Sequence, residues 1–233
     1  MRLALLKGFE LTADGIPIAI PLSAQRVATF LALQERPVLR GYVAGNLWPE
    51  ASEGHAAGSL RSALWRLRRP GHELIEACAD HLQLAPEVSV DVRESASLIR
   101  RLIETPSACP DHGLDSLSLV GELMPSWYDD WVLFERERLR QLRLHALEVL
   151  CERWSARGRY AQAVDAGLAA IRSEPLRETA HRVLMKAHLS EGNYAEALRQ
   201  YRVYRQLLWD ELGLQPSPLI ESLAHAVRNQ LPQ

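Results

Sequence analysis

The chain has 233 residues, a net charge of −2 and 47% hydrophobic residues, which is the composition of an ordinary folded protein. Because a globular domain usually runs to about 100–150 residues, we expect two domains. The balanced charge excludes a chain that binds nucleic acid through its overall charge, so any DNA-binding surface has to be local.

The cysteines and the first residues predict an intracellular protein. Cys78, Cys109 and Cys151 are odd in number and far apart, so we expect buried, reduced thiols rather than disulfides or a Cys-x-x-Cys metal site. The apolar run before Lys7 and Glu10 is too short for a signal sequence, and no later stretch is long enough to span a membrane. A cytoplasmic protein with no membrane contact, metal or cofactor is expected.

Residues 1–91 predict a small sheet, three helices and a hairpin, in that order. Strands are expected at 2–6 and 16–20 around a turn at Asp14-Gly15, since Asp-Gly supplies the positive φ of a tight hairpin. Helical spacing predicts one helix from the N-cap Ser23 to Pro37, a second over 40–47 and a third over 55–69. Alternation over 73–77 and 81–85 predicts a second hairpin. This is the element order of a winged helix-turn-helix domain.

The third predicted helix carries the features that point to DNA. Leu60, Leu64 and Leu67 fall on one side and predict a buried stripe. The other side carries no carboxylate and several guanidinium groups, and such a helix can enter a major groove, where arginine reads guanine. The predicted DNA-binding residues are His55, Ser59, Arg61, Ser62, Trp65, Arg66, Arg68 and Arg69 on this helix and His81 on the following hairpin.

The charge balance of this region leaves two functions open. Residues 1–92 hold nine Lys or Arg against ten Asp or Glu, so DNA affinity is expected to be modest and to depend on two copies. The alternative is a protein-interaction adaptor whose winged helix no longer binds DNA and serves as a docking surface. We expect no enzyme, because the chain has no Gly-rich phosphate loop and the acids Asp129 and Asp130 fit a helix N-terminus.

Residues 92–233 predict an all-α domain with an internal repeat. A helix is expected over 92–103, then a loop or linker over 105–115, and helices from Pro125 almost to the end. Gly158-Arg-Tyr160-Ala-Gln-Ala163 recurs 34 residues later as Gly192-Asn-Tyr194-Ala-Glu-Ala197, which is the tetratricopeptide period.

Each part of the repeat has a physical role. The glycine ends one helix, the tyrosine fills the gap between paired helices and the alanines allow a close approach, before Pro175 closes the first unit. Trp209 stands where the second unit would carry its proline, so we expect a longer last helix there. The fold class is therefore mainly α, an N-terminal winged helix-turn-helix followed by a tetratricopeptide-like array.

The C-terminal part resembles the bacterial transcriptional activation domain of the actinobacterial antibiotic-regulatory activators, over residues 92–231. The matching segments are Gly121-Glu-Leu-Met-Pro-Ser-Trp127-Tyr-Asp-Asp-Trp131, Glu135-Arg-Glu-Arg138-Leu, Pro175-Leu-Arg-Glu178 and Glu211-Leu-Gly213-Leu-Gln-Pro216-Ser-Pro218. The N-terminal part resembles the OmpR-type winged helix of the same family, through Leu47-Trp48-Pro49 and Leu64-Trp-Arg66-Leu67-Arg68-Arg69. It departs from the family at Asp80-His81, where glycine-tyrosine is usual, and in its early Pro70.

The resemblance implies a transcription activator. Its expected partners are double-stranded DNA with promoter direct repeats, a second copy of the chain on that DNA, and the sigma-factor region of RNA polymerase.

Overall fold

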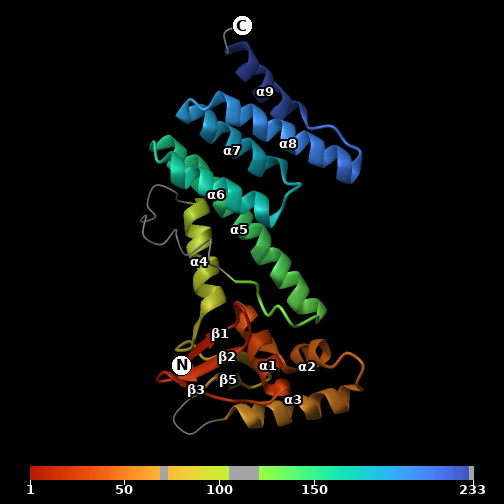
Figure 1. Cartoon of the computed structure of the whole chain (residues 1–233). Coiled ribbons are helices and arrows are strands. Elements are labelled where there is room, and N and C mark those ends of the chain that lie inside the picture. Colours follow the sequence, from red (N-terminus) through yellow and green to blue (C-terminus); the bar gives the residue numbers. More distant parts are fainter. Residues whose placement is uncertain (69–72, 105–120, 231–233) are drawn as a thin grey trace. The chain divides into compact units, whose positions relative to one another are not determined.

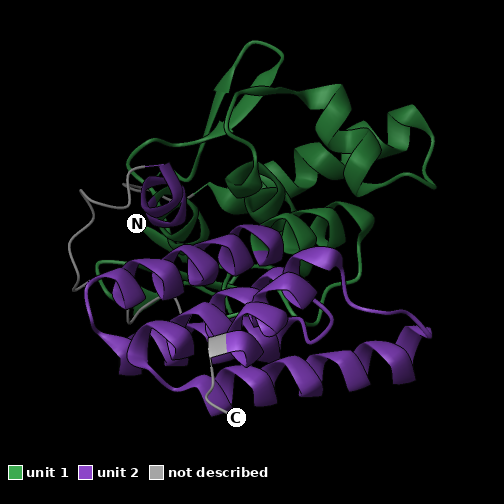
Figure 2. Cartoon of the chain, turned by 90° about the horizontal axis from the view of Figure 1, so that it is seen from above, with its two compact units in different colours: residues 1–97, 120–139 green, residues 98–119, 140–233 purple. Residues whose placement is uncertain are grey.

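The computed structural model describes residues 1–68, 73–104 and 121–230 (Figure 1). The chain divides into two compact units, which Figure 2 shows in different colours. Unit 1 holds residues 1–97 and 120–139, and unit 2 holds residues 98–119 and 140–233.

Short strands form two sheets in unit 1. In the first, β1 (Arg2–Ala4) lies between β2 (Glu10–Ala13), antiparallel to it, and β7 (Ser89–Val90), parallel to it, and β3 (Ile16–Pro17) pairs with β2. The second sheet has the antiparallel order β4 (Val38–Leu39), β6 (His81–Leu84), β5 (Ile75–Cys78). The β5–β6 hairpin is the predicted wing.

The first hairpin differs in part from its prediction. Asp14 and Gly15 have φ of 51° and 80° and form the expected turn, but the turn joins β2 to β3 rather than strands at 2–6 and 16–20. The sequence does not predict β2, β4 or β7. Strands of two to four residues offer too little alternation to be recognised, and they form because distant partners pair with them.

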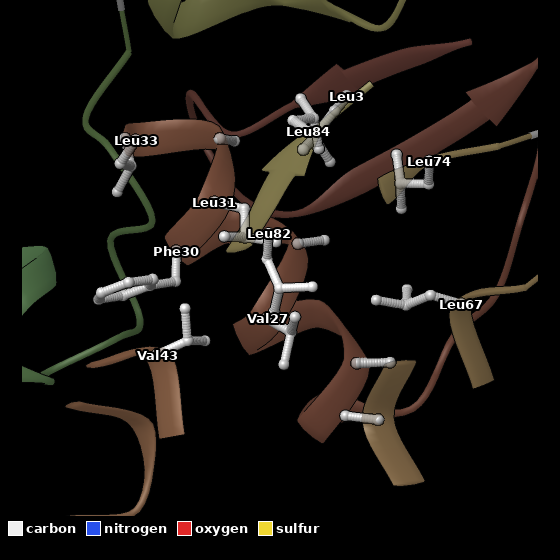
Figure 3. Close-up of a cluster of buried hydrophobic side chains, with 14 of the residues drawn as sticks. Leu3, Val27, Phe30, Leu31, Leu33, Val43, Leu67, Leu74, Leu82 and Leu84 are labelled. Carbon is white, nitrogen blue, oxygen red and sulfur yellow. The ribbon is translucent and has the colours of Figure 1, made fainter. Parts of the chain in front are cut away.

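The predicted helices of unit 1 are present as α1 (Leu22–Leu33), α2 (Arg40–Leu47), α3 (Glu53–Leu67) and α4 (Asp91–Glu104), the last of which continues into unit 2. The expected N-cap Ser23 is wrong: α1 begins at Leu22 after Pro21, whose fixed φ suits the entry to a helix. Side chains from β1, α1, α2, α3 and the wing meet in one buried cluster (Figure 3). The fold of this part is the winged helix-turn-helix that the element order predicts.

Arg93 on α4 stabilises the end of α1. Its guanidinium donates hydrogen bonds to the carbonyl oxygens of Leu31, Ala32 and Gln34, at 2.7–3.0 Å. A helix C-terminus leaves its last carbonyls without helical partners, and of these three the Leu31 carbonyl also accepts a bond from the backbone N–H of Gln34. Burial lowers the pKa of Arg93 from its usual value, although the carboxylate of Glu35 opposes this shift.

A later segment returns to unit 1 and adds to its core. Leu6 and Leu123 form an antiparallel bridge, and the ring of Trp131 packs edge-on against Phe30 with 5.2 Å between centroids. Arg26 of α1 forms an ion pair with Asp129. The division between the compact units therefore does not fall between residues 91 and 92. The division into functional domains at that boundary stays a prediction.

Arg136 holds the returning segment in place. It donates hydrogen bonds to the carbonyls of Leu123, Met124 and Trp127 at 2.6–2.9 Å and forms an ion pair with Glu122. Arg136 lies on α5 (Asp130–Ala156), which begins at the acidic pair as predicted.

Unit 2 contains the repeat. The remainder of α5 is followed by α6 (Tyr160–Ser173), α7 (Glu178–Glu191), α8 (Tyr194–Leu212) and α9 (Pro218–Gln230). Gly158 and Gly192 have φ of 71° and 89° and separate the helices of each pair, as the repeat predicts. The tetratricopeptide-like array is confirmed, and α8 runs on past Trp209 to the left-handed Gly213.

Small residues bring α6 close to α7. Ala163 and Ala170 are fully buried, and a Cβ added to Gly167 would lie 3.1 Å from two side-chain carbons of Leu184. The thiol of Cys151 also lies near Gly167, and burial raises the pKa of this thiol to about 12.

Cys151 is buried as expected, whereas Cys78 is exposed on the wing, and Cys109 lies outside the described residues.

Candidate nucleic-acid interface

The inner side of α3 is held by α1 and α2, which both pack against it. Ala56, Leu60, Ala63 and Leu67 are at most 5% exposed and form the buried stripe. Leu60 and Leu67 turn inward as predicted, but Leu64 is only half-buried against the core, and Ala63 is fully buried in its place. The orientation of α3 is nevertheless the expected one.

The outer side of α3 is open to solvent over its whole length. His55, Arg61, Ser62, Trp65, Arg66 and Arg68 are exposed, and Ser59 is half-buried. Trp65 is 73% exposed, an unusual position for so large an apolar side chain. Arg69 lies outside the described residues.

Few internal bonds involve the outer side of α3. Ser62 Oγ donates to the carbonyl of Gly58 at 3.1 Å, His55 Nδ1 lies 2.8 Å from Ser52 Oγ, and Arg66 donates a 3.4 Å bond to Ser23 Oγ. In the described part of the chain, no ion pair involves Arg61, Arg66 or Arg68. Their positive charge is therefore not neutralised by neighbouring carboxylates.

The wing turns at Ala79 and Asp80, with φ of 48° at Ala79, and His81 follows on the exposed side of β6. Arg40, the first residue of α2, fixes the turn: its backbone N–H donates to Asp80 at 2.7 Å and its guanidinium donates to Ala79 at 3.3 Å. The contact of Arg40 with the wing could not be predicted from the sequence, because no local pattern indicates a hydrogen bond to a residue forty positions away. These hydrogen bonds therefore fix the turn of the wing against the first residue of α2.

Of the predicted site residues, those that the structure describes on α3 and at its C-cap lie outside its buried stripe, while His81 belongs to the wing. Among the described residues, no three His, Cys, Asp or Glu side chains are grouped as metal ligands would be. None of the described helices combines the length and apolar character needed to cross a bilayer.

Comparison with known proteins identifies the C-terminal region first. Residues 118–228 match the model of the bacterial transcriptional activator domain. The chain is 28% identical to the regulatory protein AfsR of Streptomyces coelicolor, over 97% of this chain and 24% of AfsR. It is 39% identical to the transcriptional regulator RedD of the same organism, over 38% of this chain and 24% of RedD. Over residues 118–228 the chain therefore carries the pattern of the activator domain, and over nearly its whole length it is similar to Streptomyces regulatory proteins.

A solved structure has a similar fold. The structure of Mycobacterium tuberculosis EmbR in complex with a low-affinity phosphopeptide superposes with a TM-score of 0.80 and 22% identity, covering all of this chain and 66% of EmbR. The chain spans about a quarter of the length of its Streptomyces relatives.

The activator-family motifs have structural roles within each unit. In the segment Pro175–Glu178, Arg177 donates to both carboxylate oxygens of Glu148 and to Gln141, and Glu178 accepts a 2.9 Å bond from the backbone N–H of Ser217. Ser217 belongs to the last motif, so one motif of unit 2 bonds to another. These motifs stabilise the array. The candidate interface is therefore the outer side of α3, where the arginines are exposed.

Proposed function

We propose that this chain is a sequence-specific DNA-binding transcriptional activator that places α3 in the major groove. The observation that carries the proposal is the set of exposed guanidinium groups of Arg61, Arg66 and Arg68, which have no ion-pair partner in the described residues and share a helix with no exposed carboxylate after Glu53. A duplex supplies the missing negative charge along its phosphates and guanine acceptors in its groove.

Each side chain has a role that its position favours. Arg66 reads a guanine through two parallel hydrogen bonds, once it exchanges its weak bond to Ser23 for the base. Ser59, Ser62 and His55, nearer the N-terminus of α3, donate to bases or phosphates. Arg61 and Arg68 bind phosphates, and His81 on the wing contacts the phosphate backbone.

The affinity of one copy is expected to be modest, since the acids and bases of residues 1–92 nearly cancel. We therefore include in the proposal a pair of copies on direct repeats, which gains affinity because the second binding event is local. Activation would follow from contact between the bound protein and the sigma-factor region of RNA polymerase.

The test is a gel-shift titration of Arg66→Ala against a promoter site selected by the wild-type chain. The variant is expected to lose about 1–3 kcal/mol of specific binding free energy and to discriminate less at one base pair. Arg36→Ala is the matched control, because Arg36 is exposed in the same unit but belongs to the loop between α1 and β4. Equal promoter affinity for wild type and Arg66→Ala at fixed salt would contradict the assignment.

A phosphate contact should behave differently from a base contact. Arg68→Ala is expected to weaken binding to all sequences alike and to lower the salt dependence of log K by about 0.9. If the salt dependence is unchanged, Arg68 does not touch the backbone.

The adaptor function is the competing proposal, and the near-neutral charge of residues 1–92 favours it. Retention on a DNA resin at low salt separates the two proposals. Passage of the full chain through such a resin would overturn the DNA-binding proposal in favour of the adaptor.

A further inference from the structure

Trp65 is an exposed indole among the arginines and serines of α3. It is 73% exposed, and none of the aromatic or cation–π contacts of the described residues involves it. The other tryptophans of unit 1, Trp48, Trp127 and Trp131, are partly buried against the core. Trp65 therefore contributes little to the fold, and its apolar area is available to a ligand.

The neighbours of Trp65 on α3 define where that ligand lies. Arg61 lies one turn before it on α3, and Arg68 is the residue that directly follows the last residue of α3, so exposed guanidinium groups precede and follow the indole along the chain. Gly58, seven residues earlier, adds no side chain to the same side. A polyanion held by the two arginines would lie against the indole as well.

The chemistry of the indole selects one group on such a duplex. An indole offers a large apolar surface and a single N–H donor, so it gains most from an apolar group. In the major groove the apolar group that distinguishes one base from the others is the 5-methyl group of thymine. Phosphates and the remaining base edges are charged or polar and suit the arginines and serines of α3.

We infer that Trp65 contacts the 5-methyl group of a thymine and makes that position of the binding site specific for thymine. This inference rests on the proposed function, since it assumes that α3 enters the major groove. It adds a direct apolar contact to base reading that otherwise depends on hydrogen bonds.

The test removes the methyl group from the DNA and the indole from the protein. The full wild-type chain first selects a high-affinity duplex from a random library. Each thymine of that duplex is then replaced singly by uracil, which keeps the hydrogen-bonding groups and lacks only the methyl group. We expect one replacement to weaken wild-type binding about fourfold, the value of one buried methyl group.

The same replacement is expected to leave the affinity of Trp65→Ala unchanged, because the partner of the methyl group is gone. Phe134→Ala is the control variant: Phe134 is 77% exposed and lies on α5, so this variant should keep the wild-type response to uracil. Thermal unfolding of all three proteins checks that none loses its fold.

The outcomes separate this inference from the proposed function. If a duplex is selected but no uracil effect depends on Trp65, the thymine contact is wrong and DNA binding stands. If Trp65→Ala binds the selected duplex as wild type does, the indole faces another ligand and the inference is overturned. If the chain selects no duplex, both the proposed function and the thymine contact fail.

Discussion

The arginines of two regions of this protein differ in their surroundings. On α3, Arg61, Arg66 and Arg68 are exposed and lack ion pairs within the described residues. In the repeat array, Arg177 is 17% exposed and donates two hydrogen bonds to Glu148 and one to Gln141. The residue type alone therefore does not distinguish a ligand-binding arginine from a structural one; the surrounding acceptors do.

The largest expected effect concerns the paired arginine. Arg177→Ala leaves the carboxylate of Glu148, which is 12% exposed at its side chain, without its cationic partner, and breaking such a buried pair costs about 3 kcal/mol of unfolding free energy. Chemical denaturation of the full chain measures this loss. Arg202→Ala, at an exposed position of α8, should change stability by less than about 0.5 kcal/mol. Similar stabilities for the two variants would remove the contrast between the regions.

A glycine in the array gives the next effect. Gly192 ends α7 with φ of 89°, a conformation that side chains with a Cβ adopt only with strain. Gly192→Ala is expected to lower the unfolding free energy by about 1–2 kcal/mol, although no atom lies within 4 Å of the added Cβ. An unchanged denaturation midpoint would show that the turn relaxes without cost.

The same substitution on α3 should have the opposite sign. Gly58 lies in a right-handed helix, and its added Cβ would meet only Arg61 Nη2, at 3.7 Å. Gly58→Ala is expected to raise the unfolding free energy by up to about 1 kcal/mol, because alanine favours a helix over glycine. If α3 lies against DNA, the same variant binds its promoter more weakly, since the methyl group separates the two surfaces. If Gly58→Ala is more stable than wild type and binds the promoter with equal affinity in gel-shift titrations, the DNA does not contact α3 at Gly58.

Acid should destabilise the array through His181. Burial lowers the pKa of His181 from its usual 6.5, against opposing contributions from the Pro175 carbonyl and the Glu178 carboxylate. Below pH 6.5 the unfolded chain therefore binds a proton that the folded chain does not, and the unfolding free energy falls as the pH falls. Denaturation of wild type and His181→Gln at pH 7.5 and 5.5 tests this. Equal losses in the two proteins would assign the acid sensitivity to another group.

Local pattern was enough to predict much of the fold. The bounds of α2 match their prediction, and the positive φ angles at Gly158 and Gly192 occur where the 34-residue repeat requires them. The exposed side of α3 was also predictable, because a buried stripe at helical spacing leaves the opposite side in solvent. Its role in DNA binding stays a prediction.

Long-range contacts escaped prediction. The pairs Arg40 with Asp80, Arg26 with Asp129 and Glu178 with Ser217 join residues that are 39 or more positions apart. No periodicity marks such partners, since each forms only when separate elements have already packed. The return of the segment around Trp131 to unit 1 belongs to the same class.

The order of the helices and the wing hairpin of residues 1–104 was determined by sequence alone, because helical spacing and turn residues act over a few positions. Tertiary structure decided which short segments became strands, that Ala63 rather than Leu64 is fully buried on α3, and which arginines are paired. Pairing and burial depend on groups brought together from distant parts of the chain, so they are properties of the packed molecule rather than of any local stretch of residues.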